Sequence, residues 1–143
     1  MGPIVCATRG GEASRRTQER AIALARERGD HLIFLFVADT NFVQPNNQAL
    51  ADVLADELER LGRRLLCIAQ ARAHEEGILA DMVVRHGTVR QTIEGFLREV
   101  KAGTLVLGAP GTGSEKKTFS QEELPQFAQA ISLNTGVEVI VVR

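Results

Sequence analysis

The sequence of 143 residues contains neither tryptophan nor tyrosine, and its aromatic content of 4% consists of six phenylalanines. Proteins that bind single-stranded nucleic acid stack the bases on aromatic rings, so this shortage argues against such a ligand. The charges point the same way, because 17 basic and 18 acidic residues leave a formal net charge of -1 and no field that would attract a polyanion. We therefore expect no nucleic acid partner.

Long apolar runs are also absent. The longest, 32–38 and 137–142, span only seven and six residues, whereas a helix that crosses a bilayer needs roughly 20. The first residues do not form a basic segment followed by an apolar one, which is the pattern of a secretory signal. These observations predict no membrane insertion and a cytoplasmic location.

Cysteine and histidine are scarce. Cys6 and Cys67 lie in apolar periodic segments without C-x-x-C spacing, so we interpret both as small buried hydrophobic residues in a reducing compartment. The three histidines lie in different segments, and none shares a helical face with a second strong ligand at metal spacing. The sequence therefore predicts no metal site; these histidines are His31, His74 and His86.

Short apolar runs alternate with segments of helical periodicity along the whole chain. Runs that are apolar almost throughout are typical of parallel strands covered on both faces. Alternation at this spacing requires right-handed crossovers, which predicts an α/β fold: a doubly wound five-stranded parallel sheet with helices on both faces, in a single domain over residues 1–143. The predicted strands are 3–8, 31–39, 78–85, 104–108 and 137–142.

Four helices are predicted between these strands. The first ends at Gly29, the third opens with a capping box at Thr88 and ends by Gly103, and the fourth runs from a capping box at Ser120 to about Asn134. The second is a long amphipathic helix ending near Gly77, in which apolar residues recur at steps of three and four. They are Leu50, Leu54, Leu58, Leu61, Leu65 and Ile68.

Gly62 stands inside this second helix. A glycine in a helix interior costs about 1 kcal/mol relative to alanine, because its backbone loses more freedom on folding. We therefore expect Gly62 to be a weak point of the helix.

Two segments should meet where ligands bind in such sheets, outside the carboxyl ends of the strands at the point where strand order reverses. The first is 8–11, Thr-Arg-Gly-Gly, in which the glycines allow a tight turn and the next helix presents free N–H groups. An anion could dock beside Arg9. The alternative is that the glycines only make the turn and that Arg9 is solvated or paired with an acid.

The second segment, 108–117, is rich in glycine and carries a serine and two lysines, which can bind phosphate. Its spacing does not match a P-loop, because Ser114 and Glu115 stand where Lys and Ser/Thr are required. The alternative is a surface loop without a ligand.

Catalytic machinery is not visible in the sequence. It contains no G-x-S-x-G nucleophile elbow, and neither cysteine has a motif-level partner. We predict that the chain is not an enzyme. The alternative is a slow ATPase activity, because catalytic residues that are distant in sequence can meet in the folded structure.

Four segments together resemble the universal stress protein family over essentially the whole chain. They are 4–14 at the first strand and turn, 37–39, 84–87, and the glycine-rich fourth strand 105–111. The resemblance implies five parallel strands and a homodimer paired through the last strands. The predicted dimer edge is Val137, Val139 and Val141, which would be an exposed apolar edge if it were unpaired.

One branch of this family binds ATP through glycine, two residues, glycine, nine residues, then glycine and Ser or Thr. Gly108 and Gly111 match the first half of that signature, but Gln121 and Glu122 stand in the second half. Arg9 stands where the family usually has an aspartate. A carboxylate near the expected phosphates would repel them, whereas Arg9 reverses the local charge.

Two hypotheses follow from the resemblance. The first is a dimeric binding and regulatory module of the stress response that does not bind ATP in the usual manner. The second is a regulator that binds ATP or AMP, with Mg²⁺, through the loops after strands one and four. The ligand-binding positions carried over from the family are Ala7, Thr8, Arg9, Val37, Leu107, Gly108, Gly111, Gly113 and Ser114.

Overall fold

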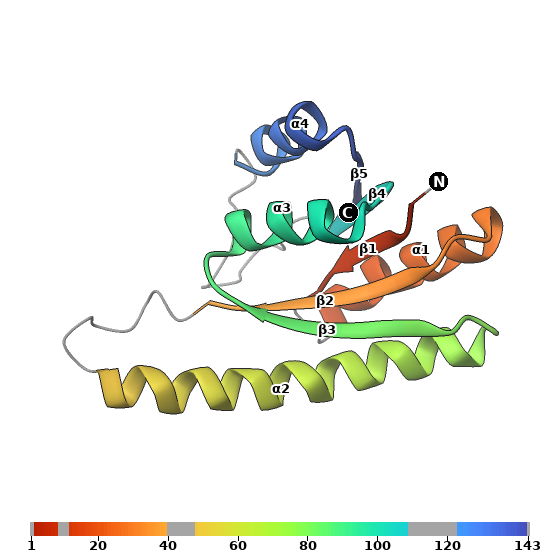
Figure 1. Ribbon diagram of the computed structural model, residues 1–143. Coiled ribbons are helices and arrows are strands. Elements are labelled where there is room, and N and C mark those ends of the chain that lie inside the picture. Colours follow the sequence, from red (N-terminus) through yellow and green to blue (C-terminus); the bar gives the residue numbers. More distant parts are fainter. Residues whose placement is uncertain (1, 9–11, 40–47, 109–122, 143) are drawn as a thin grey trace.

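A computed structural model of the chain describes residues 2–8, 12–39, 48–108 and 123–142. Within these ranges, strands and helices alternate along the chain, as Figure 1 shows. The elements are β1 (Ile4–Ala7), α1 (Glu12–Arg28), β2 (Leu32–Ala38), α2 (Gln48–Glu75), β3 (Ala80–His86), α3 (Val89–Val100), β4 (Thr104–Gly108), α4 (Glu123–Thr135) and β5 (Glu138–Val142).

The five strands form one parallel sheet in the order β3-β2-β1-β4-β5. β1 lies in the centre, with Ile4, Val5 and Cys6 fully buried. The chain builds outward from β1 through β2 to β3, then crosses back over the sheet to β4 on the other side of β1. The predicted α/β class, the doubly wound parallel sheet and its single-domain organisation are confirmed.

Helices cover both faces of the sheet. α1 and α2 pack on the face that carries Ile4, Cys6, Phe34 and Val106, while α3 and α4 pack on the face that carries the alternate residues of the same strands. This alternation is the two-residue period of a strand, with each face apolar because each is covered. None of the helices in the described ranges has an apolar stretch long enough to cross a bilayer.

The predictions for the helix caps and the two cysteines are confirmed only in part. Thr88 occupies the N-cap of α3 with extended backbone, but its side chain makes no capping hydrogen bond, so that predicted capping box is wrong. The other predicted box, at Ser120, lies outside the described residues. Cys6 is buried as predicted, whereas Cys67 is exposed, although its sulfur lies 3.8 Å from the Met82 sulfur of β3.

α2 places its apolar residues differently from the prediction. Its fully buried positions are Gly62, Leu66, Ala69 and Ala73, which face the sheet. Of the six residues in the predicted stripe, Leu58 and Leu65 pack partly against the core, and three are about half exposed: Leu50, Leu61 and Ile68. Three small residues and Leu66 therefore make the helix-to-sheet contact, and the residues of the predicted stripe lie beside it or face outward.

At Gly62 the backbone of α2 lies close to the Phe36 side chain of β2. A Cβ at this position would lie 2.4 Å from Cδ1 of Phe36, on β2. The expectation that Gly62 is a weak point is wrong, because the packing of α2 on the sheet requires a residue without a side chain there.

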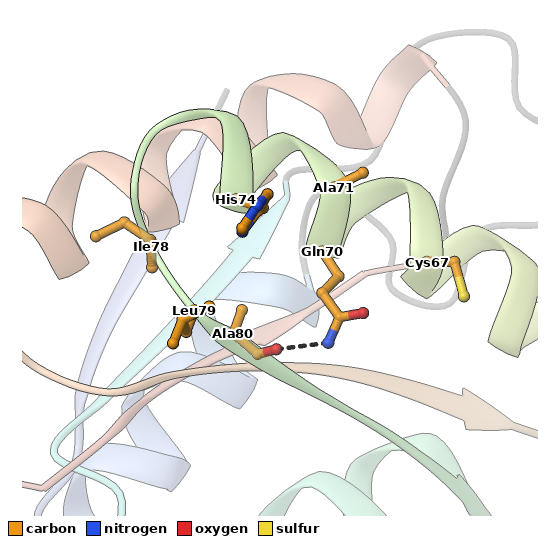
Figure 2. A pocket seen from close by; sticks show the side chains of 7 residues that line it. All are labelled: Cys67, Gln70, Ala71, His74, Ile78, Leu79 and Ala80. Carbon is orange, nitrogen blue, oxygen red and sulfur yellow. Dashed lines mark hydrogen bonds between the residues drawn. The ribbon is translucent and has the colours of Figure 1, made fainter.

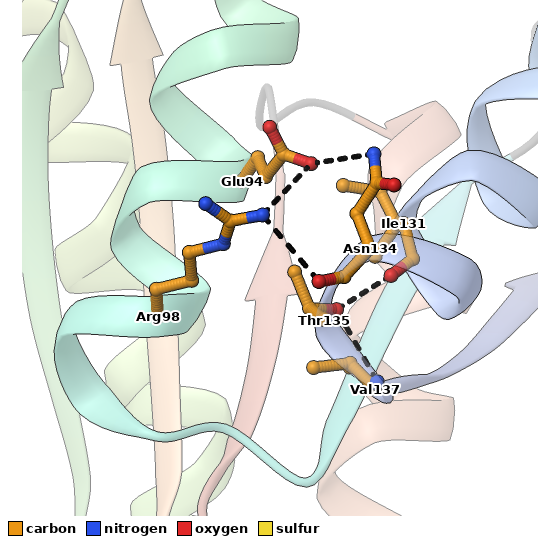
Figure 3. Close-up of polar contacts among 6 residues, drawn as sticks. All are labelled: Glu94, Arg98, Ile131, Asn134, Thr135 and Val137. Carbon is orange, nitrogen blue, oxygen red and sulfur yellow. Dashed lines mark hydrogen bonds and ion pairs between the residues drawn. The ribbon is translucent and has the colours of Figure 1, made fainter.

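Polar contacts join α3 to α4, as Figure 3 shows. Asn134 at the end of α4 donates to Glu94 of α3 at 3.1 Å, and Arg98 donates to the Asn134 carbonyl at 3.4 Å. Thr135 accepts a hydrogen bond from the Val137 N–H at 3.2 Å and donates to the Ile131 carbonyl. These contacts end α4 and direct the chain into β5, which begins at Glu138 rather than at Val137.

The amino ends of β4 and β5 are tied to α1 by one charged group. Arg28 donates to Glu138 at 2.9 Å and to the Thr104 hydroxyl at 3.0 Å. The hydrogen bond from Arg28, with the positive charge of that guanidinium, lowers the pKa of Glu138. This contact positions the edge strand β5 in the sheet.

We expect Gly62→Ala to lower the free energy of unfolding by about 1–3 kcal/mol, because the clash with Phe36 outweighs a gain in helix propensity of up to about 1 kcal/mol. Gly95→Ala is the matched control, since no atom lies within 4 Å of a Cβ at this helical position. It should raise stability by about 0.5–1 kcal/mol. Urea unfolding of both variants measures the difference, and equal effects would contradict the packing role of Gly62.

Candidate functional site

The point at which strand order reverses lies between β1 and β4. Ala7 is in register with Leu107, so the two strands end at the same level. β2 continues further, and the Thr8 N–H donates to the Leu35 carbonyl at 2.9 Å, which holds the chain to β2 just after β1 ends. In sheets of this kind the crevice at such a reversal is the usual ligand site. The structure therefore brings Ala7, Thr8, Leu107 and Gly108 together at one edge of the sheet.

Thr8 is held by a chain of buried polar groups. Gln18 of α1 is 1% exposed, and its side-chain amide donates to the Thr8 hydroxyl at 3.0 Å. Arg72 of α2 donates to the side-chain oxygen Oε1 of Gln18 at 2.7 Å. A buried side-chain amide whose NH₂ and oxygen both have hydrogen-bond partners costs little free energy on burial, and it holds those partners in position. The Thr8 hydroxyl consequently has a set position under the reversal point.

Sequence reasoning missed Gln18 and Arg72. A signal existed for Gln18, because it precedes Ala21, Ile22 and Ala25 by three, four and seven residues and so shares their buried helical face. A polar side chain in an apolar stripe requires a partner. No local pattern indicates that the partners are Thr8 and Arg72, which are distant in sequence.

Gly108, at the end of β4, faces α1. A Cβ at this position would lie 2.6 Å from the Thr17 hydroxyl oxygen. Thr17 is 3% exposed and its carbonyl also faces the Cys6 sulfur, at 4.0 Å. The first glycine of the family signature therefore has a packing reason, the close approach of α1 to β4.

The remaining predicted positions divide into two groups. The side chains of Ala7, Val37 and Leu107 pack on the sheet face that α3 and α4 cover, and Val37 is half-buried near the end of β2. The other predicted ligand positions lie outside the described residues: Arg9, Gly111, Gly113 and Ser114, together with Gln121 and Glu122.

A cavity of about 280 Å³ lies elsewhere, between the end of α2 and the start of β3, as Figure 2 shows. Its walls are mainly apolar, and Gln70 in the wall donates to the Ala80 carbonyl at 2.7 Å. This cavity is at the amino end of β3, whereas the reversal point is at the carboxyl ends of β1 and β4. It does not coincide with any predicted ligand position.

Groups that could perform chemistry are few in the part of the chain that the structure describes. Burial raises the pKa of the Cys6 thiol to about 12, so it is neither a nucleophile nor a ligand at neutral pH. His31 contacts Asp81 at 2.8 Å and His86 contacts Glu59 at 2.9 Å. Among the described residues, no three His, Cys, Asp or Glu side chains are placed to hold a metal ion.

We expect Gly108→Ala to lower the free energy of unfolding by about 1–3 kcal/mol, because the added methyl group overlaps the Thr17 hydroxyl. In a Thr17→Ala background the same substitution should cost at least about 1 kcal/mol less, since the overlapping oxygen is gone. A double-mutant cycle by urea unfolding measures this coupling. Additive effects would show that the glycine is not required by packing.

The family model for the universal stress protein family matches residues 1–143. Universal stress protein UspA from Lactobacillus plantarum is 18% identical with a TM-score of 0.78, and the match covers 99% of this chain and 97% of that one. A universal stress protein in complex with cAMP is 23% identical with a TM-score of 0.71, covering 99% and 97%.

A universal stress protein family protein from Arabidopsis thaliana with AMP bound is 16% identical with a TM-score of 0.65, covering 98% of this chain and 90% of that one. At these identities the structures compare folds, and the match of the family model over all 143 residues identifies the family. The chain belongs to the universal stress protein family.

Proposed function

We propose that this chain is a non-catalytic regulatory module of the stress response that works as a homodimer paired through β5. The observation that carries this proposal is the contrast between the two edges of the sheet. An edge strand presents unpaired N–H and C=O groups, and proteins protect such edges with charge, cover or pairing. β3 and β5 are the two edges here.

The β3 edge is protected. Asp81, Arg85 and His86 place charged and polar groups along a strand of seven residues. Gln70 of α2 also covers the Ala80 carbonyl with a hydrogen bond of 2.7 Å. These groups oppose the addition of another strand at this edge.

The β5 edge has no such protection over residues 139–142, which are Val, Ile, Val and Val. The Glu138 N–H donates to the Gly103 carbonyl, toward β4. By alternation along a strand, the backbone groups of Val139 and Val141 point to the open edge. Val137 precedes the strand, and its N–H and carbonyl are already bonded to the Thr135 and Ser132 hydroxyls. We therefore propose Val139 and Val141, not Val137, as the residues whose backbone pairs with a second copy.

We further propose that the module does not bind ATP with the family's usual phosphate contacts. Gly108 is required by its contact with Thr17, so its presence does not by itself indicate a phosphate site. In the sequence, Gln121 and Glu122 replace the second half of the signature, and a carboxylate repels a triphosphate in a cleft of low dielectric.

The second candidate is a regulator that binds an adenine nucleotide such as AMP or ATP, the latter with Mg²⁺. The Thr8 hydroxyl, fixed by Gln18 at the reversal point, favours it. It is also favoured by related structures described as complexes with cAMP, AMP and dAMP. Binding would use Arg9 in place of the family's aspartate, and its guanidinium would attract the phosphate.

Neither candidate requires catalysis. The raised pKa of the Cys6 thiol removes the buried cysteine as a nucleophile, and both cysteines are unpaired, which fits a reducing cytoplasm.

The β5 pairing is tested by Val141→Pro, which removes an N–H that points to the open edge and leaves the bonds to β4 intact. We expect the native chain to be a dimer at about 10 μM, and the variant to be a monomer with an unchanged far-UV circular dichroism spectrum. Ile140→Pro is the control, because its N–H points toward β4 and its loss should lower stability instead. A native monomer in sedimentation, or a dimeric Val141→Pro variant, would overturn the pairing.

Nucleotide binding is tested by calorimetry with AMP and with Mg²⁺-ATP, using the native chain and the triple variant Arg9→Asp, Gln121→Gly, Glu122→Ser. The leading proposal expects no heat from the native chain at millimolar nucleotide and measurable binding by the variant. Binding by the native chain that Arg9→Ala weakens about tenfold would favour the second candidate instead.

A further inference from the structure

We propose that the outward face of α2 binds the same face of a second copy, with the two helices antiparallel. The outward face consists of Leu50, Val53, Leu61 and Ile68, which are 47%, 58%, 48% and 51% exposed, with Glu57 and Arg64 between them. These six positions follow one another at steps of three or four residues, so they share one side of the helix. The buried positions lie on the opposite side, against the sheet.

The helix is long enough to offer such a face. Its 28 residues extend about 42 Å, whereas the seven residues of β3 extend about 23 Å. Figure 1 shows the first turns of α2 continuing past the ends of the strands. Four large aliphatic side chains on one exposed helix face form a patch of the kind that marks a protein contact.

The charges along α2 identify the occupant as a second copy. On the outward face, the acidic residue Glu57 lies in the first half of the helix, while the basic residue Arg64 lies beyond Leu61. Two parallel copies would place like charges side by side. Two antiparallel copies, as a two-fold axis requires, place the acidic residue of each outward face opposite the basic residue of the other.

The outward face is also complementary to itself when it is reversed. A two-fold axis between residues 60 and 61 sets Glu57 opposite Arg64 of the second copy and Val53 opposite Ile68, and brings the two Leu61 side chains together. Leu50 then meets Ala71, which is also exposed. Acid thus meets base and apolar meets apolar at each of these positions.

The ion pairs within α2 leave Glu57 and Arg64 able to pair with a second copy. Among the residues that the structure describes, Arg64 has no ion-pair partner, and Glu57 contacts only Arg60, at 3.5 Å within its own helix. Arg60 lies near the proposed axis, and this contact with Glu57 offsets its charge there. The proposal does not depend on β5 pairing, because α2 packs over β2 and β3, at the edge of the sheet away from β5.

A single pair of helices buries less than a standard interface, so we expect a weak contact, with a dissociation constant of order 100 μM. It is measured by sedimentation equilibrium of the Val141→Pro variant, in which β5 pairing is absent. Glu57→Arg alone and Arg64→Glu alone should each weaken this association about tenfold, because they set like charges opposite each other. The double variant should return to within about threefold of the parent, since the pair is restored with reversed sign.

Asp56→Arg is the matched control, because it makes the same charge change on another side of the same helix. It should change the association less than about threefold. Additive losses in the Glu57→Arg, Arg64→Glu double variant, or an equal effect of Asp56→Arg, would overturn the antiparallel pairing.

The position of the axis is tested by cross-linking in the otherwise native chain. Leu61→Cys in a Cys67→Ser background should form a covalent dimer with a short bismaleimide, because the two residues lie side by side across the axis. Leu133→Cys in the same background is the control, since Leu133 on α4 is 78% exposed and lies outside the outward face. Equal cross-linking at both positions, or none at Leu61→Cys, would overturn the proposal whether or not β5 pairing holds.

Discussion

The structure depends on the burial of β1 in the centre of a sheet that is covered on both sides. Ile4, Val5 and Cys6 are fully buried, and their side chains alternate between the core under α1 and α2 and the core under α3 and α4. Connections between parallel strands are right-handed, so strands can be added on both sides of β1 only if the helices move to the other face of the sheet when the direction reverses. The reversal between β1 and β4, and the crevice expected there, are consequences of this arrangement.

Covering a sheet so closely constrains the helices. At Gly62 and Gly108 there is no room for a side chain, because Phe36 and Thr17 occupy the space that a Cβ would need. Protein interiors pack at the density of organic crystals, so such contacts leave little room for adjustment. A glycine in a family signature can therefore be required by packing, and its presence alone is weak evidence for a ligand.

The same close packing buries Gln18 between two helices and the end of β1. Its contacts with Thr8 and Arg72 connect α2 to the reversal point. If α2 binds a second copy and a ligand binds at the reversal point, this chain of hydrogen bonds offers a physical link between the two events. Coupling of that kind would require two arrangements of the link with different affinities at each end.

Much of the fold could be predicted from the sequence. Five apolar runs separated by helical periodicity specified the strands to within about two residues, and β4 was predicted with the bounds that it has in the structure. The fold class also followed from these local patterns, whereas the family followed from the resemblance of four segments. The local patterns succeed because strand and helix periods differ and because parallel strands buried on both faces are apolar throughout.

The candidate site could be predicted only in part. The sequence placed Thr8 and Gly108 at the carboxyl ends of β1 and β4, because the order of elements determines where strands end. The contacts of these residues with Gln18 and Thr17 could not be predicted, since contacts between distant segments depend on how the helices pack. The other ligand positions lie outside the described residues, and their role remains a prediction from the family resemblance.

The sequence by itself determined the elements, their order and the family. Only the tertiary structure decided which side of each element is buried. The predicted stripe of α2 illustrates the reason. Its leucines recur at helical spacing, yet the buried side consists of Leu66 and three small residues, because the helix approaches β2 so closely at Phe36. Helical periodicity specifies that a face exists, whereas the distance between a helix and the sheet selects the side chains that fit between them.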